Sequence, residues 1–429
     1  MDIFITITQP FVTLTTIAIC IAGLILSRSI FIIYWVISLW IVASINIDYY
    51  FKMYDQSTVV FANVYCLLFN MFFIMCQFFF FQRYEIKRIR ITEREVHRIS
   101  SLSVFLAIVG CVCLFFSVPG SASNLLTLNW QEISTLRTGG YIIIYNIAFF
   151  SIILSCSIII PYFIYRKHRL NVAIVLINFF IVLIVIKTKA LFLPLVFSIV
   201  VYIGITRSKW CSWRSLKLGS LFVITLLSFY MLTTIIRYSG SIDDLISSSS
   251  STIIERTSLL MNISVESELI NTFYRIVEYF QENETLQGAT FTRFILYPIS
   301  LFIQLDIPDN PMYLYGEITH WDTLGLLRGS NHPTIYGDTF ANFGEFGFVF
   351  GAIYAVFFGL IWRLALIQKG FGTFSTISGC CYGIPLIMRG SVYYGLYGIF
   401  LTSLFGLLIT FLLSNKMRQN SHVGFLIRS

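Results

Sequence analysis

The amino-acid sequence predicts an all-α polytopic membrane protein with about 11 transmembrane helices and one long extracytoplasmic loop. Of the 429 residues, 57% are hydrophobic and only 12% are charged, and the mean hydropathy is +0.80. A soluble domain carries about twice that share of charged residues. The charges lie in short runs between apolar stretches rather than on one polar domain, so the net charge of +8 does not indicate a nucleic-acid partner.

The predicted spans are apolar stretches that approach the roughly 20 residues needed to cross the hydrocarbon core as a helix. In chain order they cover 10–27, 29–47, 57–81, 102–118, 141–165, 170–186, 191–206, 218–236, 342–362, 371–388 and 390–413. Two charged junctions, 187–190 and Arg389, leave the count between about 10 and 12.

The distribution of basic residues predicts the orientation of the spans. Connectors that alternate along the chain, such as 82–101, 166–169 and 207–217, are rich in Lys and Arg, which marks them as cytoplasmic. The N-terminus and the segment 237–341 are then periplasmic, and the C-terminus is cytoplasmic. This divides the chain into an N-terminal bundle of about eight helices (1–236), a large periplasmic loop (237–341) and about three C-terminal helices with a tail (342–429).

The periplasmic loop is far longer than a link between two helices requires, which favours a functional role. Within it, the stretch 266–282 repeats apolar residues at the spacing of an amphipathic helix: Leu269, Ile270, Phe273, Ile276, Val277 and Phe280. The stretch 291–305 is apolar but too short to span a membrane. We expect it to lie at the membrane interface or to form a re-entrant segment.

Cations on the periplasmic side run against the usual charge bias and are candidates for binding an anionic ligand. They are Arg137, Lys187, Lys189, Arg237, Arg256, Arg275, Arg293, Arg328 and Arg389. Arg pairs with phosphate oxygens through two hydrogen bonds and Lys supplies a point charge, so the pyrophosphate of a lipid-linked substrate is a suitable ligand. The alternative is that they snorkel to the interface or pair with acidic residues of the loop.

A second candidate region, 328–351, supplies two groups that could act as a general base, His332 and Asp338. Either could accept a proton from an attacking sugar hydroxyl. Asp338 could instead cap the N-terminus of a helix, and the glycines that follow could allow close helix packing. Those glycines are Gly344, Gly347 and Gly351.

The sequence contains none of the common metalloprotease, nucleotide-binding or serine-hydrolase motifs. The adjacent Cys380 and Cys381 have no further ligand at metal-binding spacing, so we interpret them as packing residues. We therefore expect no metal site and no cofactor.

The segment NHPTIYGDTFANFGEFGFVFG, together with the overall topology, resembles the bacterial O-antigen polymerases (Wzy) and the related O-antigen ligases. His332 matches the histidine of the family segment at the loop-to-helix junction, and Asn342, Gly344 and Gly347 match its end. The segment IKTKALFLPLVF is similar to one that opens a helix with a cation, here Lys189 where the family also has Arg.

The resemblance implies a glycosyltransferase of the bacterial inner membrane. It would transfer a glycan from undecaprenyl pyrophosphate onto the next lipid-linked repeat unit, with His332 or Asp338 as base. Six residues are expected to bind the pyrophosphate: Arg137, Lys187, Lys189, Arg237, Arg256 and Arg328. Besides the lipid-linked oligosaccharides and membrane lipids, a chain-length regulator is an expected partner. An O-antigen ligase, and a lipid-linked oligosaccharide flippase or other transporter, remain alternatives.

Overall fold

The computed structural model describes the helical parts of the chain and a few residues beside them. They are residues 2–43, 53–81, 93–120, 140–165, 168–186, 193–205, 265–300, 303–309, 311–318, 332–368, 370–390 and 392–426.

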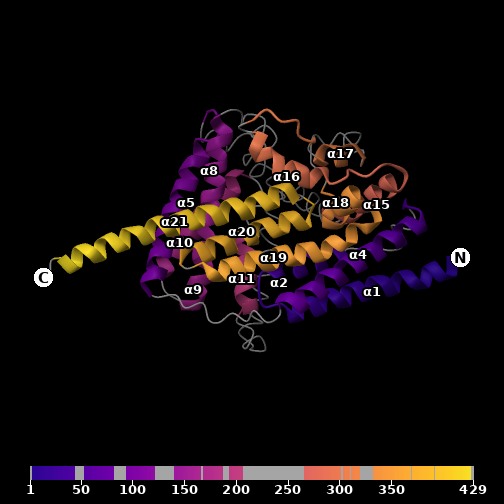
Figure 1. Cartoon of the computed structure of the whole chain (residues 1–429), viewed down its shortest axis with the longest axis horizontal. Coiled ribbons are helices and arrows are strands. Elements are labelled where there is room, and N and C mark those ends of the chain that lie inside the picture. Colours follow the sequence, from indigo (N-terminus) through magenta and orange to yellow (C-terminus); the bar gives the residue numbers. More distant parts are fainter. Residues whose placement is uncertain are drawn as a thin grey trace, which may run out of the picture. The chain divides into compact units, whose positions relative to one another are not determined.

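These residues form helices, with no strand among them (Figure 1). The elements up to residue 205 are α1 (Asp2–Leu26), α2 (Phe31–Ala43), α4 (Gln56–Cys76), η1 (Gln77–Phe81), α5 (Glu93–Phe115), α8 (Gly140–Ser155), η2 (Cys156–Ile158), α9 (Ile159–Tyr165), α10 (Arg169–Ile186) and α11 (Leu193–Ile205). The later ones are α15 (Val265–Glu282), α16 (Ala289–Ser300), α17 (Pro311–Ile318), α18 (Thr334–Phe343), η6 (Gly344–Val349), α19 (Phe350–Ile367), α20 (Phe371–Met388) and α21 (Val392–Leu426).

Within the described residues, seven stretches of helix are long and apolar enough to cross a membrane. They are Gln9–Leu26, Gln56–Phe80, Glu93–Phe115, Gly140–Tyr162, Thr334–Ile367, Phe371–Met388 and Val392–Leu412. Three further predicted windows, 29–47, 170–186 and 191–206, contain shorter apolar helices, and the window 218–236 lies outside the described residues. The helical membrane-protein class is thus supported, whereas the count of about 11 spans stays a prediction.

The chain divides into two compact units. One comprises residues 1–85, 263–362 and 383–397, and the other comprises residues 86–262, 363–382 and 398–429. In the second unit, small residues allow helices to approach closely: a Cβ atom added at Gly110 would lie 2.7 Å from Cγ1 of Ile152. Cys380 and Cys381 are buried here and form no disulfide, which agrees with their predicted packing role.

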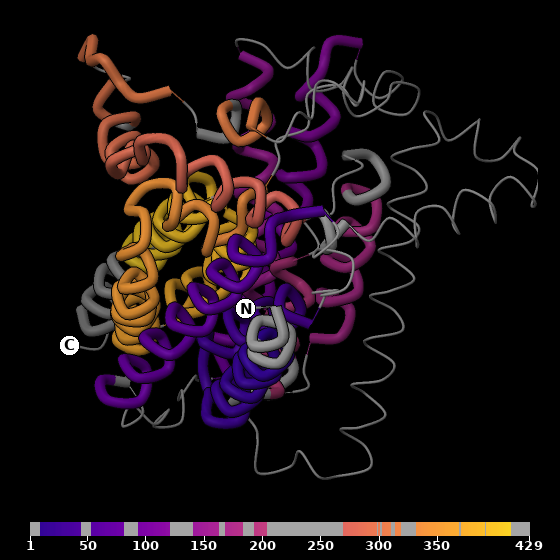
Figure 2. Tube along the Cα trace, turned by 90° about the vertical axis from the view of Figure 1, so that its right-hand side faces the viewer, coloured from indigo at the N-terminus to yellow at the C-terminus, as the bar shows by residue number. Residues whose placement is uncertain are grey.

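In the first unit, α1 packs beside α4, and α2 packs against α1 (Figure 2). Buried polar side chains seven residues apart, Asn70 in α4 and Gln77 at the start of η1, bond to α2 and to the end of α1. Nε2 of Gln77 donates to Oγ of Ser27, and Nε1 of Trp35 donates to Oε1 of Gln77 at 2.8 Å. Two helical turns earlier, Asn70 accepts hydrogen bonds from Ser38 at 2.9 Å and from Tyr34 at 2.8 Å. Such bonds between apolar helices fix their register.

Tyr336 of α18 joins this network from a distant part of the sequence. Its hydroxyl lies 2.7 Å from Oγ of Ser38 and accepts a hydrogen bond from Nδ2 of Asn70 at 3.1 Å. The side chain is fully buried. One phenol therefore connects α18 to both α2 and α4.

Replacing Tyr336 with phenylalanine is expected to destabilise the protein by about 1–3 kcal/mol, because buried polar groups of Ser38 and Asn70 lose a partner. Tyr354 provides the matched control, since its buried hydroxyl has no hydrogen-bond partner among the described residues. Tyr354→Phe should be neutral or stabilising. Unfolding of the detergent-solubilised variants would measure both effects. Equal losses of stability in the two variants would contradict this account of Tyr336.

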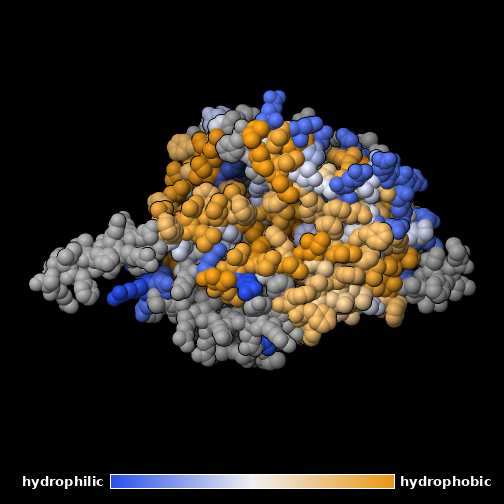
Figure 3. Space-filling view, in the orientation of Figure 1, coloured by the Kyte–Doolittle hydropathy of each residue, from blue (hydrophilic) through white to orange (hydrophobic). Residues whose placement is uncertain are grey.

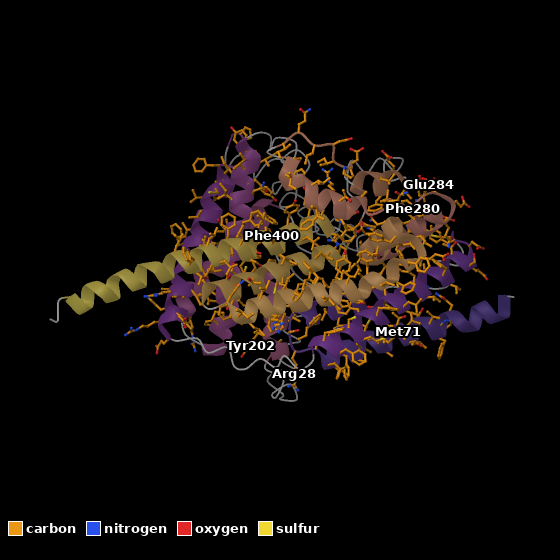
Figure 4. All side chains as sticks on the ribbon, in the orientation of Figure 1. Arg28, Met71, Tyr202, Phe280, Glu284 and Phe400 are labelled. Atoms are coloured by element: carbon orange, nitrogen blue, oxygen red, sulfur yellow. The ribbon has the colours of Figure 1, made fainter. Side chains whose placement is uncertain are left out.

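The predicted amphipathic helix over 266–282 is confirmed as α15, and all six residues of its apolar face are buried. Phe273 and Ile276 have no exposed surface. The hydroxyl of Tyr274 donates to Oδ1 of Asn63 in α4 at 3.0 Å. At the C-terminal end of the helix, the buried Phe280 is followed by the exposed Glu284 (Figure 4). This part of the predicted loop is therefore packed on the helices rather than extended in solvent.

Two of the three glycines after Asp338 have the predicted packing role. A Cβ atom at Gly347 would lie 2.3 Å from the hydroxyl oxygen of Tyr65, and one at Gly351 would lie 2.2 Å from the carbonyl oxygen of Phe69. Both therefore let η6 and α19 approach α4 closely. Gly344 differs, because an added Cβ atom would make only an ordinary contact, 3.5 Å from Cγ2 of Thr285, but the φ of this residue is +61°, a conformation that glycine adopts at no steric cost. It ends α18 and turns the chain into η6.

Candidate functional site

The predicted catalytic residues His332 and Asp338 both belong to the first unit. His332 precedes α18 and is half-buried, and Asp338 lies within α18 and is fully buried. The six residues predicted to bind pyrophosphate, Arg137, Lys187, Lys189, Arg237, Arg256 and Arg328, lie outside the described residues.

Asp338 is not a helix cap, so that alternative interpretation is wrong. Pro333 precedes the first residue of α18, and Asp338 is the fifth residue of a helix that begins at Thr334. Proline suits this place because its fixed φ is compatible with the start of a helix and no earlier helical carbonyl needs its missing N–H. The residues from Thr334 to Asn342 are all buried, so α18 is surrounded by protein on every side.

The carboxylate of Asp338 holds three helices together. Its Oδ1 atom accepts hydrogen bonds from the Tyr315 hydroxyl of α17 at 2.8 Å and from the Thr290 hydroxyl of α16 at 3.1 Å. Asn342, one turn further along α18, accepts from the backbone N–H of Thr290 at 3.2 Å and donates to its hydroxyl at 3.0 Å. Oδ2 of Asp338 is buried without a hydrogen-bond partner among the described residues.

The phenol of Tyr315 is suited to be the donor of this contact. Burial, and then the neighbouring Asp338 carboxylate, raise the pKa of Tyr315 well above its ordinary value. The hydroxyl therefore keeps its proton, and its O–H donates a hydrogen bond to Oδ1. Because α16 and α17 both bond to Asp338, this residue positions the two helices that precede His332 in the sequence.

The turn between α20 and α21 brings a cation beside the start of α18. The backbone N–H of Thr334 donates to the carbonyl oxygen of Arg389 at 3.1 Å. A Cβ atom at Gly390 would lie 2.5 Å from Cγ of Pro333, so the two segments are in close contact. Arg389 is half-buried, as is His332, which lies two residues before this hydrogen bond. The backbone segments that carry His332 and Arg389 are thus in contact.

The sequence analysis predicts Arg389 to be a periplasmic cation but provides no reason to pair it with His332. The two residues are 57 positions apart in the sequence, and their segments meet at the turn of Gly390, where φ is +88°. The other described candidates lie elsewhere: Arg275 donates to the hydroxyl of Tyr54 at 3.1 Å, and Arg293 lies on α16.

No cluster of metal-ligating side chains occurs in the described parts of the chain. No family model matches the chain, and neither a curated protein nor a solved structure matches it. The candidate site therefore consists of the His332–Arg389 junction and the Asp338 contacts that hold the neighbouring helices.

Proposed function

We propose that this chain is a glycosyltransferase of a bacterial inner membrane that polymerises an O-antigen or a related surface polysaccharide. It transfers a glycan from undecaprenyl pyrophosphate to the next lipid-linked repeat unit at the periplasmic face. The observation that carries the proposal is the contact between the segments of His332 and Arg389, where the backbone at the start of α18 meets the turn that follows α20. A base accelerates the attack of a hydroxyl group, and a cation stabilises a departing pyrophosphate.

In this proposal, a hydroxyl oxygen of the acceptor sugar attacks the anomeric carbon of the donor glycan. The bond between that carbon and the pyrophosphate oxygen breaks, and undecaprenyl pyrophosphate leaves with the bonding electrons. His332 accepts the hydroxyl proton. Arg389 stabilises the negative charge that develops on the leaving group, together with the predicted set Arg137, Lys187, Lys189, Arg237, Arg256 and Arg328.

His332 is better placed as the base than Asp338. A general base must reach the proton that it removes, and His332 retains exposed surface whereas Asp338 has none. In addition, one oxygen of the Asp338 carboxylate already accepts hydrogen bonds from Tyr315 and Thr290. We therefore assign Asp338 as a positioning residue that holds α16 and α17 against α18.

The proposal includes the predicted topology of about 11 spans. The N-terminal bundle is 1–236, the periplasmic loop is 237–341 and the C-terminal part is 342–429, with a periplasmic N-terminus and a cytoplasmic C-terminus. Supporting features are the apolar helices and the packing of α15 and α18, from the loop and its end, against α4.

Deletion of the gene in its own host tests the proposal through the lipopolysaccharide pattern. Loss of a polymerase leaves a single repeat unit on the lipid core, and the plasmid-borne chain should restore the ladder of long glycans. Loss of a ligase would leave no repeat unit, and loss of a flippase would prevent repeat units from reaching the periplasm. Either of the latter patterns would contradict the polymerase proposal.

A further inference from the structure

The helix α16 exposes an apolar surface although it is not one of the candidate spans. Ile295 is 61% exposed and Ile299, one turn later, is 42% exposed. Ile303, just beyond the helix, is 59% exposed. The opposite face of α16 carries Thr290 and Phe294, which contact the rest of the unit.

The neighbouring helix α15 shows the opposite chemistry on its exposed face. Its buried residues are apolar or aromatic except Thr272, and the exposed ones include Glu278, Gln281 and Glu282. In the space-filling view, hydrophilic residues gather over α15 and hydrophobic ones over α16 (Figure 3). Both helices belong to the same unit. Because their exposed residues differ, the outer face of α15 is suited to water and that of α16 to an apolar medium.

Direct contacts fix α16 beside the first turns of a candidate membrane span. The hydroxyl of Tyr397 in α21 donates to the carbonyl oxygen of Phe294 at 2.8 Å. The ring centroids of Tyr297 and Tyr393 are 5.5 Å apart. The candidate span of α21 is Val392–Leu412, so these contacts lie at its beginning. The medium that surrounds the N-terminal end of this candidate span therefore also contacts the outer face of α16.

Arg293 and the tyrosines around it are the residues expected at the level of lipid head groups. The guanidinium carbon lies 5.6 Å from the ring centroid of Tyr297 and 5.7 Å from that of Tyr393. NH1 donates to the carbonyl oxygen of Pro308 at 2.5 Å. Among the described residues, none of these interactions of Arg293 is with a carboxylate.

We propose that α16 is an interfacial membrane helix that rests in the bilayer surface. Ile295 and Ile299 contact the acyl chains of phospholipids, and Arg293 with Tyr297 and Tyr393 lies at the depth of the phosphates. The occupant of this face is membrane phospholipid. A re-entrant segment is disfavoured because α16 has a buried polar face bonded to Asp338 and Asn342. The inference does not depend on the proposed enzymatic function.

Photo-crosslinking tests the inference without any activity measurement. The photoreactive residue p-benzoylphenylalanine is placed at Ile295 or Ile299 in the full chain, which is then reconstituted in nanodiscs of phospholipid with an alkyne on its acyl chain. The matched controls carry it at Glu278 or Glu284, both exposed near or on α15. Positions 295 and 299 should yield several times more lipid adduct than the controls. Equal yields, or adducts with a second copy of the protein in place of lipid, would overturn the inference.

Cysteine labelling provides an independent measurement on the same four positions. A water-soluble maleimide should modify Cys at 278 and 284 several times faster than Cys at 295 and 299, after the background of the parent chain is subtracted. Comparable rates at all four positions would place α16 in water and contradict the proposal.

Discussion

His332→Ala is expected to abolish the ladder of long glycans and to lower the rate of polymerisation by about 10²–10⁴, the usual contribution of a positioned general base. The protein should still reach the membrane and unfold at nearly the temperature of the parent, since His332 is half-buried and lies just outside α18. The rate would be measured with purified protein and a lipid-linked repeat unit.

The control for this variant is His97→Ala, which removes an exposed histidine from α5 in the other unit. It should polymerise normally. Arg389→Ala is expected to reduce activity as well, and Arg389→Lys should restore part of it because a charge is retained without the planar guanidinium. If His332→Ala makes glycans at the parental rate, His332 is not the base.

Asp338→Ala is expected to destabilise the protein by about 3 kcal/mol, because it leaves the buried hydroxyls of Tyr315 and Thr290 without an acceptor. Tyr315→Phe alone should cost less. The double variant should lose less stability than the sum of the two single variants, with a coupling of about 0.5–3 kcal/mol. Unfolding curves of the three variants in one detergent would give these differences.

Asp338→Asn separates a positioning role from a catalytic one. The amide oxygen of asparagine can still accept the hydrogen bonds from Tyr315 and Thr290, but an amide cannot accept a proton from a substrate hydroxyl. We therefore expect Asp338→Asn to retain most of the parental activity, whereas Asp338→Ala loses activity along with stability. A folded Asp338→Asn protein that makes no polymer would reverse the assignment and make Asp338 the base.

The fold class and the amphipathic face of α15 could be predicted from the sequence, because both depend on local features. Apolar length determines which segments suit a membrane, and a period of 3.6 residues determines which face of a helix is buried. Hence Phe273, Ile276 and the other four predicted residues of α15 are buried as expected. The packing role of Gly347 and Gly351 followed from their small size.

Only the tertiary structure decided which distant residues meet. Asp338 is joined to Tyr315 and Thr290, Tyr336 to Ser38 and Asn70, and Thr334 to Arg389. A polar side chain within an apolar helix can satisfy its hydrogen bonds with many partners, and no local pattern specifies which. By itself, therefore, the sequence determined a helical membrane protein and the candidates His332 and Asp338. The tertiary packing gave these two residues different surroundings and hence different proposed roles.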